Sequence, residues 1–247
     1  MARWIEGRVI EQRQWAARLY SLKVKAEDIV FEAGQFTKLA LPADGEMLAR
    51  AYSFVSAPLE RPYEFYYVTV TDGPLTQRLA RLVPGDALFL SPNPSGFLVL
   101  SEVPDAENLW MLATGTGIAP FLSLLKTEAL WKRFGRVVLM HAVRYTSELS
   151  YRDEIAGLQA MHPGRLAPVS VVSRERLEGA LSGRIPAAIL DGRLEEAAGV
   201  GLSASNSQVM ICGNPAMVTD AVHALAGRGL KKHRRRSPGQ ITFENYW

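Results

Sequence analysis

A change of hydrophobic pattern near residue 100 limits the possible folds of this chain more than any other feature of its sequence. Beyond it, apolar runs of strand length alternate with helix-like stretches. The runs lie at 109–113, 137–143, 168–172 and 209–212, and the helix-like stretches lie at 121–133, 151–161 and 215–226. Nearly continuous apolar strands between helices are typical of a parallel sheet covered on both faces. Asn214 followed by Pro215 marks the start of the last helix, because asparagine caps helices and proline suits the first helical position.

The first 100 residues instead show short β segments separated by turn residues. Residues 65–71 are rich in aromatic and β-branched side chains and are followed by Asp72-Gly73-Pro74. A second turn, Pro84-Gly85-Asp86, precedes a segment at 87–90. An antiparallel barrel is the simplest fold for such segments, because closure removes exposed strand edges. We therefore predict two domains, an N-terminal antiparallel β-barrel at 1–101 and a C-terminal α/β domain with a parallel sheet at 102–247.

Composition excludes several classes of protein. With 48% hydrophobic and 21% charged residues, the chain can bury a core, which excludes a disordered protein. The single cysteine, Cys212, excludes an intrachain disulfide, a four-thiolate zinc site and an iron–sulfur cluster held by this chain alone. The four histidines lack metal-ligand spacing, so we expect no metal. One cysteine and the early charges at Arg3, Glu6 and Arg8 indicate a reducing, cytoplasmic setting without a signal peptide.

The uncharged run at 108–125 is long enough to raise the question of a membrane span. Glycines and a proline interrupt it, so a buried strand, a turn and a helix explain it better, and we expect no membrane association. The same run carries a candidate anion site, Thr114-Gly115-Thr116-Gly117-Ile118-Ala119-Pro120. A turn from strand to helix offers backbone N–H groups, and two glycines let a dinucleotide come close. The third glycine of the usual dinucleotide fingerprint is absent, so a plain tight turn is the alternative.

Basic residues follow the strands of the predicted parallel sheet. Arg144 follows the second strand, where an enzyme specific for NAD would be expected to carry a carboxylate. Ser173-Arg174 follows the third strand, and Arg184 comes directly after Gly183. Guanidinium groups bind phosphate through two hydrogen bonds, so the 2′-phosphate of NADP is the natural ligand, with ordinary surface arginines as the alternative.

Two further segments carry weaker signals. In Arg50-Ala51-Tyr52-Ser53, an arginine could neutralise a pyrophosphate, a tyrosine could stack on a planar ring and a serine could bond a ring nitrogen. A strand with one inward aromatic is the alternative. The run Lys231-Lys232-His233-Arg234-Arg235-Arg236 holds five of the 28 basic residues in a chain of net charge +3. Such a run is a solvated loop or a contact for nucleic acid or another acidic partner.

Four motifs stand in a definite order: Arg50-Ala51-Tyr52-Ser53, Gly115-Thr116-Gly117-Ile118-Ala119-Pro120, Cys212-Gly213-Asn214-Pro215 and the terminal Glu244-Asn245-Tyr246-Trp247. In this order they resemble the motifs of bacterial ferredoxin/flavodoxin–NADP(+) reductases, of the type that ends in an aromatic pair. The similarity extends over essentially the whole chain. It implies an N-terminal FAD-binding barrel, a C-terminal NADPH-binding domain and a flavin ring at their interface.

The resemblance also implies roles for individual residues. On the FAD side, Arg50 would contact the pyrophosphate with Ala51 beside it, Tyr52 would stack on the isoalloxazine and Ser53 would lie near flavin N5. Tyr66, Tyr67 and Val68 match the strand that lines the flavin, while Pro74, Leu75 and Thr76 match a turn whose amides face the FAD phosphates. On the NADP side, Thr116 lies where both nucleotides approach. The positions that match the rest of the NADP site are Arg144, Ser173, Arg174 and Arg184 for the adenosine end, and Asp220 on the helix after Asn214.

The C-terminal segment receives a role from the same resemblance. Trp247 would cover the adenine and Tyr246 the isoalloxazine, or the reverse, with a frayed end or a simple docking contact as the alternative. Cys212 would lie beside nicotinamide C4 with an orienting role, although an unpaired cysteine is commonly a small buried apolar group. Glu244 would assist proton movement near flavin N5. Ser53, Cys212 and Glu244 are therefore the candidate catalytic residues.

The implied function is hydride transfer between NADPH and FAD, coupled to one-electron exchange with ferredoxin or flavodoxin. The 231–236 run would then steer an acidic redox partner, an effect that salt weakens, and the chain would act as a monomer. Three alternatives stay open: an NADH-dependent reductase component of an oxygenase, a non-catalytic flavin or NADP sensor, and a nucleic-acid-binding protein. The first often carries an extra iron–sulfur domain, for which this chain lacks the length and the thiols. The last lacks a recognition motif.

Overall fold

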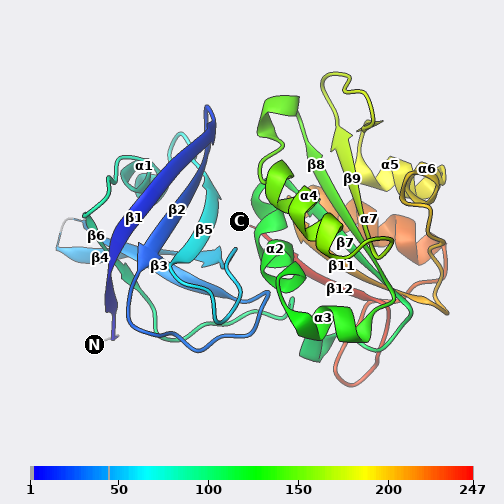
Figure 1. The fold of residues 1–247 in the computed structure, drawn as a ribbon, viewed down its shortest axis with the longest axis horizontal. Helices are drawn as coiled ribbons and strands as arrows, with labels where there is room; N and C mark the ends of the chain where they lie inside the picture. The colour runs from blue at the N-terminus through cyan, green and yellow to red at the C-terminus, as the bar shows by residue number, and fades with distance from the viewer. Residues whose placement is uncertain (1–2, 44, 247) are drawn as a thin grey trace.

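The computed structural model describes residues 3–43 and 45–246, and it contains two six-stranded sheets that lie side by side (Figure 1). The first sheet is antiparallel, in the order β4-β3-β6-β1-β2-β5. Its strands are Ile5–Ala16 (β1), Leu19–Lys25 (β2), Phe36–Ala43 (β3), Glu46–Ser53 (β4), Tyr63–Val68 (β5) and Ala87–Leu90 (β6). A short helix, Pro74–Leu79 (α1), connects β5 to β6 along the chain.

An isolated antiparallel bridge closes this sheet into a barrel. Phe54, just beyond β4, pairs with Phe65 of β5, and the Val55 amide donates to the Glu64 carbonyl at 2.8 Å. These contacts join the two strands at opposite ends of the sheet order, so the sheet curls round on itself. Aromatic rings pack in its interior, where the ring centroids of Phe31 and Phe54 lie 3.8 Å apart in a stacked arrangement. The predicted antiparallel barrel is confirmed.

The second sheet is parallel, in the order β10-β9-β8-β7-β11-β12. Its strands are Asn108–Thr114 (β7), Arg136–Val143 (β8), Leu166–Val172 (β9), Leu181–Ser182 (β10), Ser207–Gly213 (β11) and Ile241–Asn245 (β12). The four apolar runs of the sequence are β7, β8, β9 and β11, and the predicted parallel sheet is confirmed. The two edge strands were not predicted, because β10 has two residues and β12 mixes polar with apolar side chains.

Helices cover both faces of the parallel sheet, as Figure 1 shows. One face packs against Ala119–Leu125 (α2), Glu128–Arg133 (α3) and Arg152–Met161 (α4), and the other packs against Ile185–Leu190 (α5), Arg193–Ala198 (α6) and Pro215–Gly227 (α7). Strand side chains alternate between two hydrophobic clusters, with Met111 in one and Trp110 in the other. Within the described ranges, no helix is long and apolar enough to cross a membrane.

The helix-like stretch predicted at 121–133 is divided in the structure, because the chain forms α2 and α3 with a break between them. Thr127 adopts an extended backbone conformation, and its hydroxyl donates to the Leu124 carbonyl at 2.7 Å. The Trp131 indole donates to the Leu125 carbonyl at 2.8 Å. These side chains occupy carbonyls at the end of α2 that the next helical turn would otherwise use.

A shared hydrophobic cluster joins the barrel to the parallel sheet. Val55 and Tyr66 from the barrel side pack with Ile118 and Phe121 at the start of α2, and all four side chains are buried. The first turn of the sequence motif at 115–118 is a 3₁₀ helix that leads directly into α2. The glycine turn therefore lies against the barrel, which places the end of β7 at the junction between the two sheets.

Candidate functional site

The carboxyl ends of β7 and β11 form the centre of the candidate site. These strands are neighbours, but the sheet continues through β8 on one side and through β12 on the other. Ligands of open α/β sheets bind where the strand order reverses in this way, because the turns after the two strands diverge and leave a crevice. The glycine turn follows β7, and Gly213-Asn214 lies at the end of β11. Two motifs far apart in sequence thus meet at one reversal point.

The two turns pack too closely for side chains at Gly117 and Gly213. A Cβ atom at Gly117 would lie 2.5 Å from the Cys212 carbonyl oxygen, and one at Gly213 would lie 2.1 Å from Thr114 Oγ1. Gly213 also has a φ of +137°, in the region that favours glycine. The Asn214 amide donates to Thr114 Oγ1 at 2.9 Å and fixes the contact.

Gly115 serves the turn in a different way, because open space surrounds it and its φ is +52°. Its carbonyl oxygen lies 3.1 Å from His141 Nε2. Burial lowers the pKa of His141 to about 4, so the imidazole is neutral near pH 7 and holds the turn as a hydrogen-bond donor. The predicted residue Thr116 is buried in the same turn.

Strand β12 brings the chain back to this crevice. It pairs with β11, with Cys212 opposite Glu244. The Tyr246 amide donates to the Gly213 carbonyl at 3.0 Å, and the Tyr246 hydroxyl donates to Ser53 Oγ at the end of β4. The structure therefore brings together the three candidate catalytic residues and Tyr246, although Ser53 lies far from the other three in the sequence.

Burial raises the pKa of the acidic side chains in this group. The pKa of the Cys212 thiol lies well above its ordinary value, chiefly because of burial, and the nearby Glu244 carboxylate acts in the same direction. Burial likewise raises the pKa of the Tyr246 hydroxyl, which interacts with the Cys212 thiol as well as with Ser53. Both groups are neutral near pH 7, so they can orient a planar ring but cannot act as anionic nucleophiles.

The Glu244 carboxylate anchors β12 to the barrel side. It accepts hydrogen bonds from the backbone amides of Phe97 and Leu98, in the segment between β6 and β7. Burial raises the pKa of Glu244, and the two amides oppose part of that rise. Glu244 therefore holds a proton to a higher pH than an exposed glutamate does, while its carboxylate keeps the chain end in place.

Strand β5 presents alternate side chains to two faces. Tyr66 and Val68 face the junction between the sheets, where the Tyr66 hydroxyl lies 2.8 Å from Ser150 Oγ. Tyr67 belongs to the barrel core and lies edge-on to Tyr52, with ring centroids 6.1 Å apart. The three residues that match the flavin-lining strand thus divide between the junction and the barrel interior.

Arg50 and Ala51 are exposed on β4, at one end of the antiparallel sheet order. The Arg50 guanidinium donates to the Ala49 carbonyl at 2.7 Å. Its charge lies at the surface, three residues before Ser53 along the strand. An exposed guanidinium in this place can pair with a phosphate.

The turn at the start of α1 offers backbone groups and not side chains. Leu75 is buried in the barrel core, and the Thr76 hydroxyl donates to the Gly73 carbonyl at 3.2 Å and accepts from the Val70 amide at 3.0 Å. Pro74 stands at the first helical position. The amides of a first helical turn have no acceptor inside the helix, so they can face an anion.

The predicted arginines gather at the ends of β8, β9 and β10, where all are exposed. The Arg174 amide donates to the Arg144 carbonyl at 2.9 Å, and Ser173 precedes it at the end of β9. The Arg174 guanidinium donates to the Tyr145 hydroxyl at 3.3 Å. Arg184 precedes α5 and follows β10, which pairs with β9. This arginine edge, made of Arg144, Arg174 and Arg184, has the charge to bind a phosphate dianion.

Two predicted residues stand apart from these groups. Asp220 is exposed on α7, whose N-cap is Asn214 as predicted, with the Asn214 side chain accepting from the Ala216 amide at 3.0 Å and the Met217 amide at 3.3 Å. Trp247, expected to cover a ring of FAD, lies outside the described residues.

Comparison with known proteins gives the family of this chain. A flavodoxin/ferredoxin–NADP reductase of Shigella flexneri is 49% identical over 248 residues, with 100% of both chains covered. One from Escherichia coli strain K12 is 48% identical with the same coverage. The chain belongs to the flavodoxin/ferredoxin–NADP reductase family. The resemblance inferred from the four motifs is confirmed.

Two further comparisons support this family membership. Residues 111–223 match the oxidoreductase NAD-binding domain, which in this chain runs from β7 to α7. The crystal structure of a ferredoxin NADP+ reductase from Neisseria gonorrhoeae, with bound FAD and NADP, is similar with a TM-score of 0.94 and 36% identity. The similarity covers 99% of each chain, so it includes both sheets and their junction.

Some residues of the region were not among the sequence predictions. Phe97 supports Glu244 from 147 positions away in the chain, and Tyr151 donates to Glu64 from 87 positions away. No local pattern signals such pairs, because each partner belongs to an ordinary strand, loop or helix start. In contrast, Gly213 belongs to the motif Cys212-Gly213-Asn214-Pro215, and its close approach to Thr114 explains why a glycine stands there.

Proposed function

We propose that this chain is an FAD-dependent ferredoxin/flavodoxin–NADP(+) oxidoreductase, with FAD held by residues 1–101 and NADP(H) by residues 102–247. The observation that carries the proposal is the position of Tyr246, whose hydroxyl contacts Ser53 of the barrel and Cys212 of the parallel sheet. An aromatic ring tethered to both sheets beside a strand-order reversal suits the place where a flavin and a nicotinamide meet.

The residues of the barrel side fit FAD. Arg50 offers an exposed positive charge to a pyrophosphate, the first-turn amides of α1 offer N–H donors, and the half-buried ring of Tyr52 offers a stacking surface. We assign the remaining FAD contacts to Ala51, Ser53, Tyr66, Tyr67, Val68, Pro74, Leu75, Thr76, Tyr246 and Trp247. When bound, FAD supplies the capacity to accept a hydride and to exchange single electrons.

The chain's own residues orient the reactants. Ser53 and Cys212 place neutral hydrogen-bonding groups beside Tyr246, so they can align flat rings without adding charge. Glu244, whose pKa burial raises, is the one carboxylic acid of the three candidate catalytic residues and can hold and release a proton at its carboxylate oxygens. Its hydrogen bonds from Phe97 and Leu98 keep that carboxylate at the junction.

The arginine edge accounts for the choice of NADP(H) over NAD(H). Arg144, Arg174 and Arg184 project from neighbouring strand ends, as a doubly charged 2′-phosphate requires, and Ser173 adds a hydroxyl. Thr116 lies in the glycine turn between this edge and the barrel, and Asp220 is a further proposed contact from α7. A carboxylate at the end of β8 would instead favour the free ribose hydroxyls of NADH.

The first test is an absorption spectrum of the purified protein, followed by separate anaerobic titrations with NADPH and NADH. We expect a yellow protein whose flavin absorbance is bleached at far lower NADPH than NADH concentration. Equal responses to the two nucleotides would favour the oxygenase-reductase alternative. A protein that stays colourless after incubation with FAD would refute the flavin assignment.

We further propose that the acceptor is an acidic ferredoxin or flavodoxin that approaches the 231–236 run, and that the enzyme works as a cytoplasmic monomer. The run lies on the loop that precedes β12, where the Arg235 guanidinium stands over the Phe97 ring, 5.2 Å from its centroid, and the Phe97 amide in turn binds Glu244. Arg235 pairs with Glu102 at 2.9 and 3.0 Å, which fixes the loop, while Lys231, Arg234 and Arg236 are exposed. Exposed charges of one sign increase the association rate of an oppositely charged partner, and salt weakens the effect.

Changing Lys231, Arg234 and Arg236 to glutamine tests this docking surface, with Lys25, Lys38 and Arg81 changed together as a control of equal charge. We expect the first triple variant to reduce an acidic ferredoxin or flavodoxin about tenfold more slowly at low salt, with a weaker salt dependence. The control triple should stay near the wild type. Equal behaviour of the two triple variants would rule out steering by this run.

A further inference from the structure

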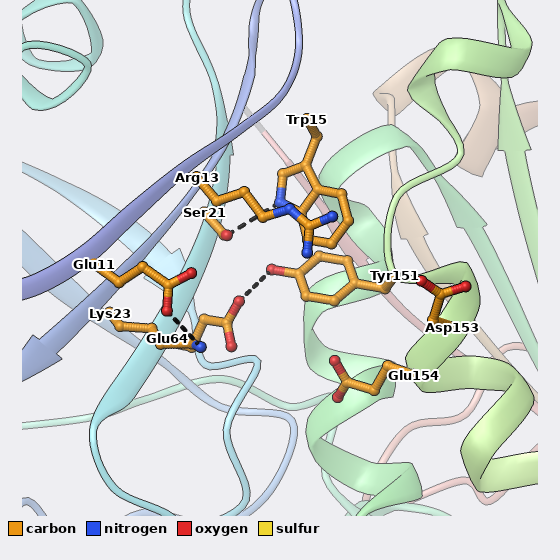
Figure 2. A pocket seen from close by; sticks show the side chains of 9 residues that line it. All are labelled: Glu11, Arg13, Trp15, Ser21, Lys23, Glu64, Tyr151, Asp153 and Glu154. Carbon is orange, nitrogen blue, oxygen red and sulfur yellow. Dashed lines mark hydrogen bonds and ion pairs between the residues drawn. The ribbon is translucent and has the colours of Figure 1, made fainter.

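A polar junction lies between the β1–β2 hairpin of the barrel and the start of α4, beside a cavity of about 240 Å³. Figure 2 shows the side chains that line it. The barrel contributes Glu11, Arg13, Trp15, Ser21, Lys23 and Glu64, and the other side contributes Tyr151, Asp153 and Glu154. The chemistry proposed for the chain uses none of these residues, although they join the two sheets.

Tyr151 is the central contact of this junction. Its hydroxyl donates to Glu64 Oε1 at 2.8 Å, and its ring packs on Trp15 with centroids 4.6 Å apart (Figure 2). The same ring meets Tyr66 edge-on at 5.2 Å. Tyr151, Glu64 and Tyr66 are all buried. One side chain of the parallel-sheet half therefore contacts a barrel carboxylate and two barrel aromatics.

The backbone of Tyr151 is held in an unusual conformation. Its φ is +61°, and no other non-glycine residue among residues 3–43 and 45–246 has a positive φ. A tyrosine adopts the left-handed region only where the surrounding contacts fix it there. The hydrogen bond to Glu64 and the two ring contacts supply that constraint, so the local backbone depends on the barrel.

The neighbouring residue makes a second link. Ser150 Oγ lies 2.8 Å from the hydroxyl of Tyr66, which is one of the residues proposed to line the flavin. Two consecutive residues, Ser150 and Tyr151, are thus hydrogen-bonded to Tyr66 and Glu64, which lie two positions apart on β5. Residues i and i+2 of a strand share a face, so both links reach the same side of β5.

The segment that carries these links also carries Arg144. The Glu148 carboxylate accepts from the Arg144 amide at 2.9 Å and from the Tyr145 amide at 3.3 Å. The Ser150 amide donates to the Glu148 carbonyl at 2.9 Å. Hydrogen bonds within this segment therefore connect the arginine edge to Ser150, which directly precedes Tyr151.

We propose that Tyr151 is a positioning residue that couples the arginine-bearing segment 144–151 to the flavin-side strand β5, and so sets the placement of bound NADP(H) relative to the flavin. The inference rests on the proposed function, because it concerns transfer between two nucleotides held by different sheets. Tyr151 itself touches neither nucleotide in this scheme. It acts through Glu64 and Tyr66, and a small displacement of aligned reactants is enough to slow their reaction.

The test compares Tyr151→Phe with Tyr63→Phe in the FAD-loaded protein. Tyr63 is the matched control, because it too is a buried tyrosine, but it lies on β5 and its hydroxyl accepts from the Ile29 amide at 2.6 Å within the barrel. Three quantities are measured: the rate constant of flavin reduction at saturating NADPH, the Kd of 2′-phospho-AMP by calorimetry, and the deuterium uptake of residues 144–151.

For Tyr151→Phe we expect flavin reduction to slow about tenfold and deuterium uptake in 144–151 to rise, while the Kd of 2′-phospho-AMP stays within about twofold. The 2′-phospho-AMP probe contacts only the arginine edge, so it does not report placement against the flavin. Tyr63→Phe should change neither the rate nor the uptake. A rate and uptake equal to those of the Tyr63→Phe control would overturn the proposal, as would a loss of 2′-phospho-AMP binding as large as the loss of rate.

Two more variants keep the proposal testable if Tyr151→Phe folds poorly. Glu64→Gln retains an acceptor oxygen for the Tyr151 hydroxyl, so its rate should stay within about twofold of the wild type, whereas Glu64→Leu should slow reduction as Tyr151→Phe does. Equal rates for the glutamine and leucine variants would overturn the coupling. A wild-type protein that NADPH does not reduce would refute the proposed function, and deuterium uptake would still report on the link.

Discussion

The two ends of the proposed site use opposite physical means. Ser53 and Cys212 are buried and Tyr246 is half-buried, all three side chains are neutral, and contacts between segments distant in sequence hold them. At the arginine edge the groups are exposed and charged, and each comes from the end of its own strand. The reacting end therefore depends on exact packing, whereas the specificity end depends on charge. Changes to the two ends should therefore differ in kind as well as in size.

The largest effect is expected at the packed end, from Gly213→Ala. A Cβ atom there would lie 2.1 Å from Thr114 Oγ1, and the φ of +137° is unfavourable for alanine. We expect a loss of about 3 kcal/mol in the free energy of unfolding and loss of flavin reduction, because the two turns must move apart. Urea unfolding followed by circular dichroism measures the stability.

Gly229→Ala is the control for this substitution. Gly229 also has a positive φ, +85°, but no atom lies within 4 Å of the Cβ position. Its replacement should lower the free energy of unfolding by only about 1 kcal/mol, because alanine is less stable than glycine at a positive φ. Equal free energies of unfolding for the two variants would show that the close contact between the turns adds no cost to the substitution at Gly213.

The next effect is expected at the charged end, from the double variant Arg174→Ala and Arg184→Ala. Removing two guanidiniums should weaken NADPH binding about 100-fold and leave NADH nearly unchanged, because only NADPH carries the 2′-phosphate. Stability should change little, since both side chains are exposed. Titration with each nucleotide at two salt concentrations measures the effect, and equal losses for NADPH and NADH would remove the distinction between the two ends.

The smallest effect is expected from Glu64→Gln, at the junction that connects the ends. Burial raises the pKa of Glu64, and Glu154 adds to the rise while the hydrogen bond from Tyr151 opposes it. A raised folded-state pKa gives stability that is present below the ordinary glutamate pKa and is lost as pH rises through the raised value. Glutamine does not titrate, so the stability of Glu64→Gln relative to the wild type should increase between pH 4 and 7.

The exposed residue Glu6 provides the control for this pH dependence. The free energy of unfolding is measured at several pH values for Glu6→Gln, Glu64→Gln and the wild type. Glu6→Gln gives the effect of removing one exposed negative charge, so any further pH dependence of Glu64→Gln is due to burial of its carboxyl. A flat difference for Glu64→Gln would show that the junction carboxyl keeps an ordinary pKa. The junction would then differ from the packed end, where burial raises the pKa values of Cys212, Glu244 and Tyr246.

The sequence predicted the class of fold well, because local patterns determine it. The four apolar runs became β7, β8, β9 and β11, since a strand buried on both faces needs apolar residues at every position. The predicted helix-like stretch at 121–133 is interrupted where Thr127 and Trp131 occupy the carbonyls at the end of α2. Side-chain bonds of that kind do not follow from hydrophobic period, so the break was not visible in the pattern.

Two sheets of different kind, a glycine turn after the first parallel strand and arginines after the later ones could all be predicted from the amino-acid sequence alone. Each of these depends on residues close together in the chain, where side-chain size and polarity act directly on the backbone. The contacts of Tyr246 with Ser53, of Glu244 with Phe97 and of Tyr151 with Glu64 follow instead from the folded arrangement of the two sheets. These pairs form because strand order and sheet closure bring distant segments together, and burial there changes their pKa values in a way that no local pattern encodes.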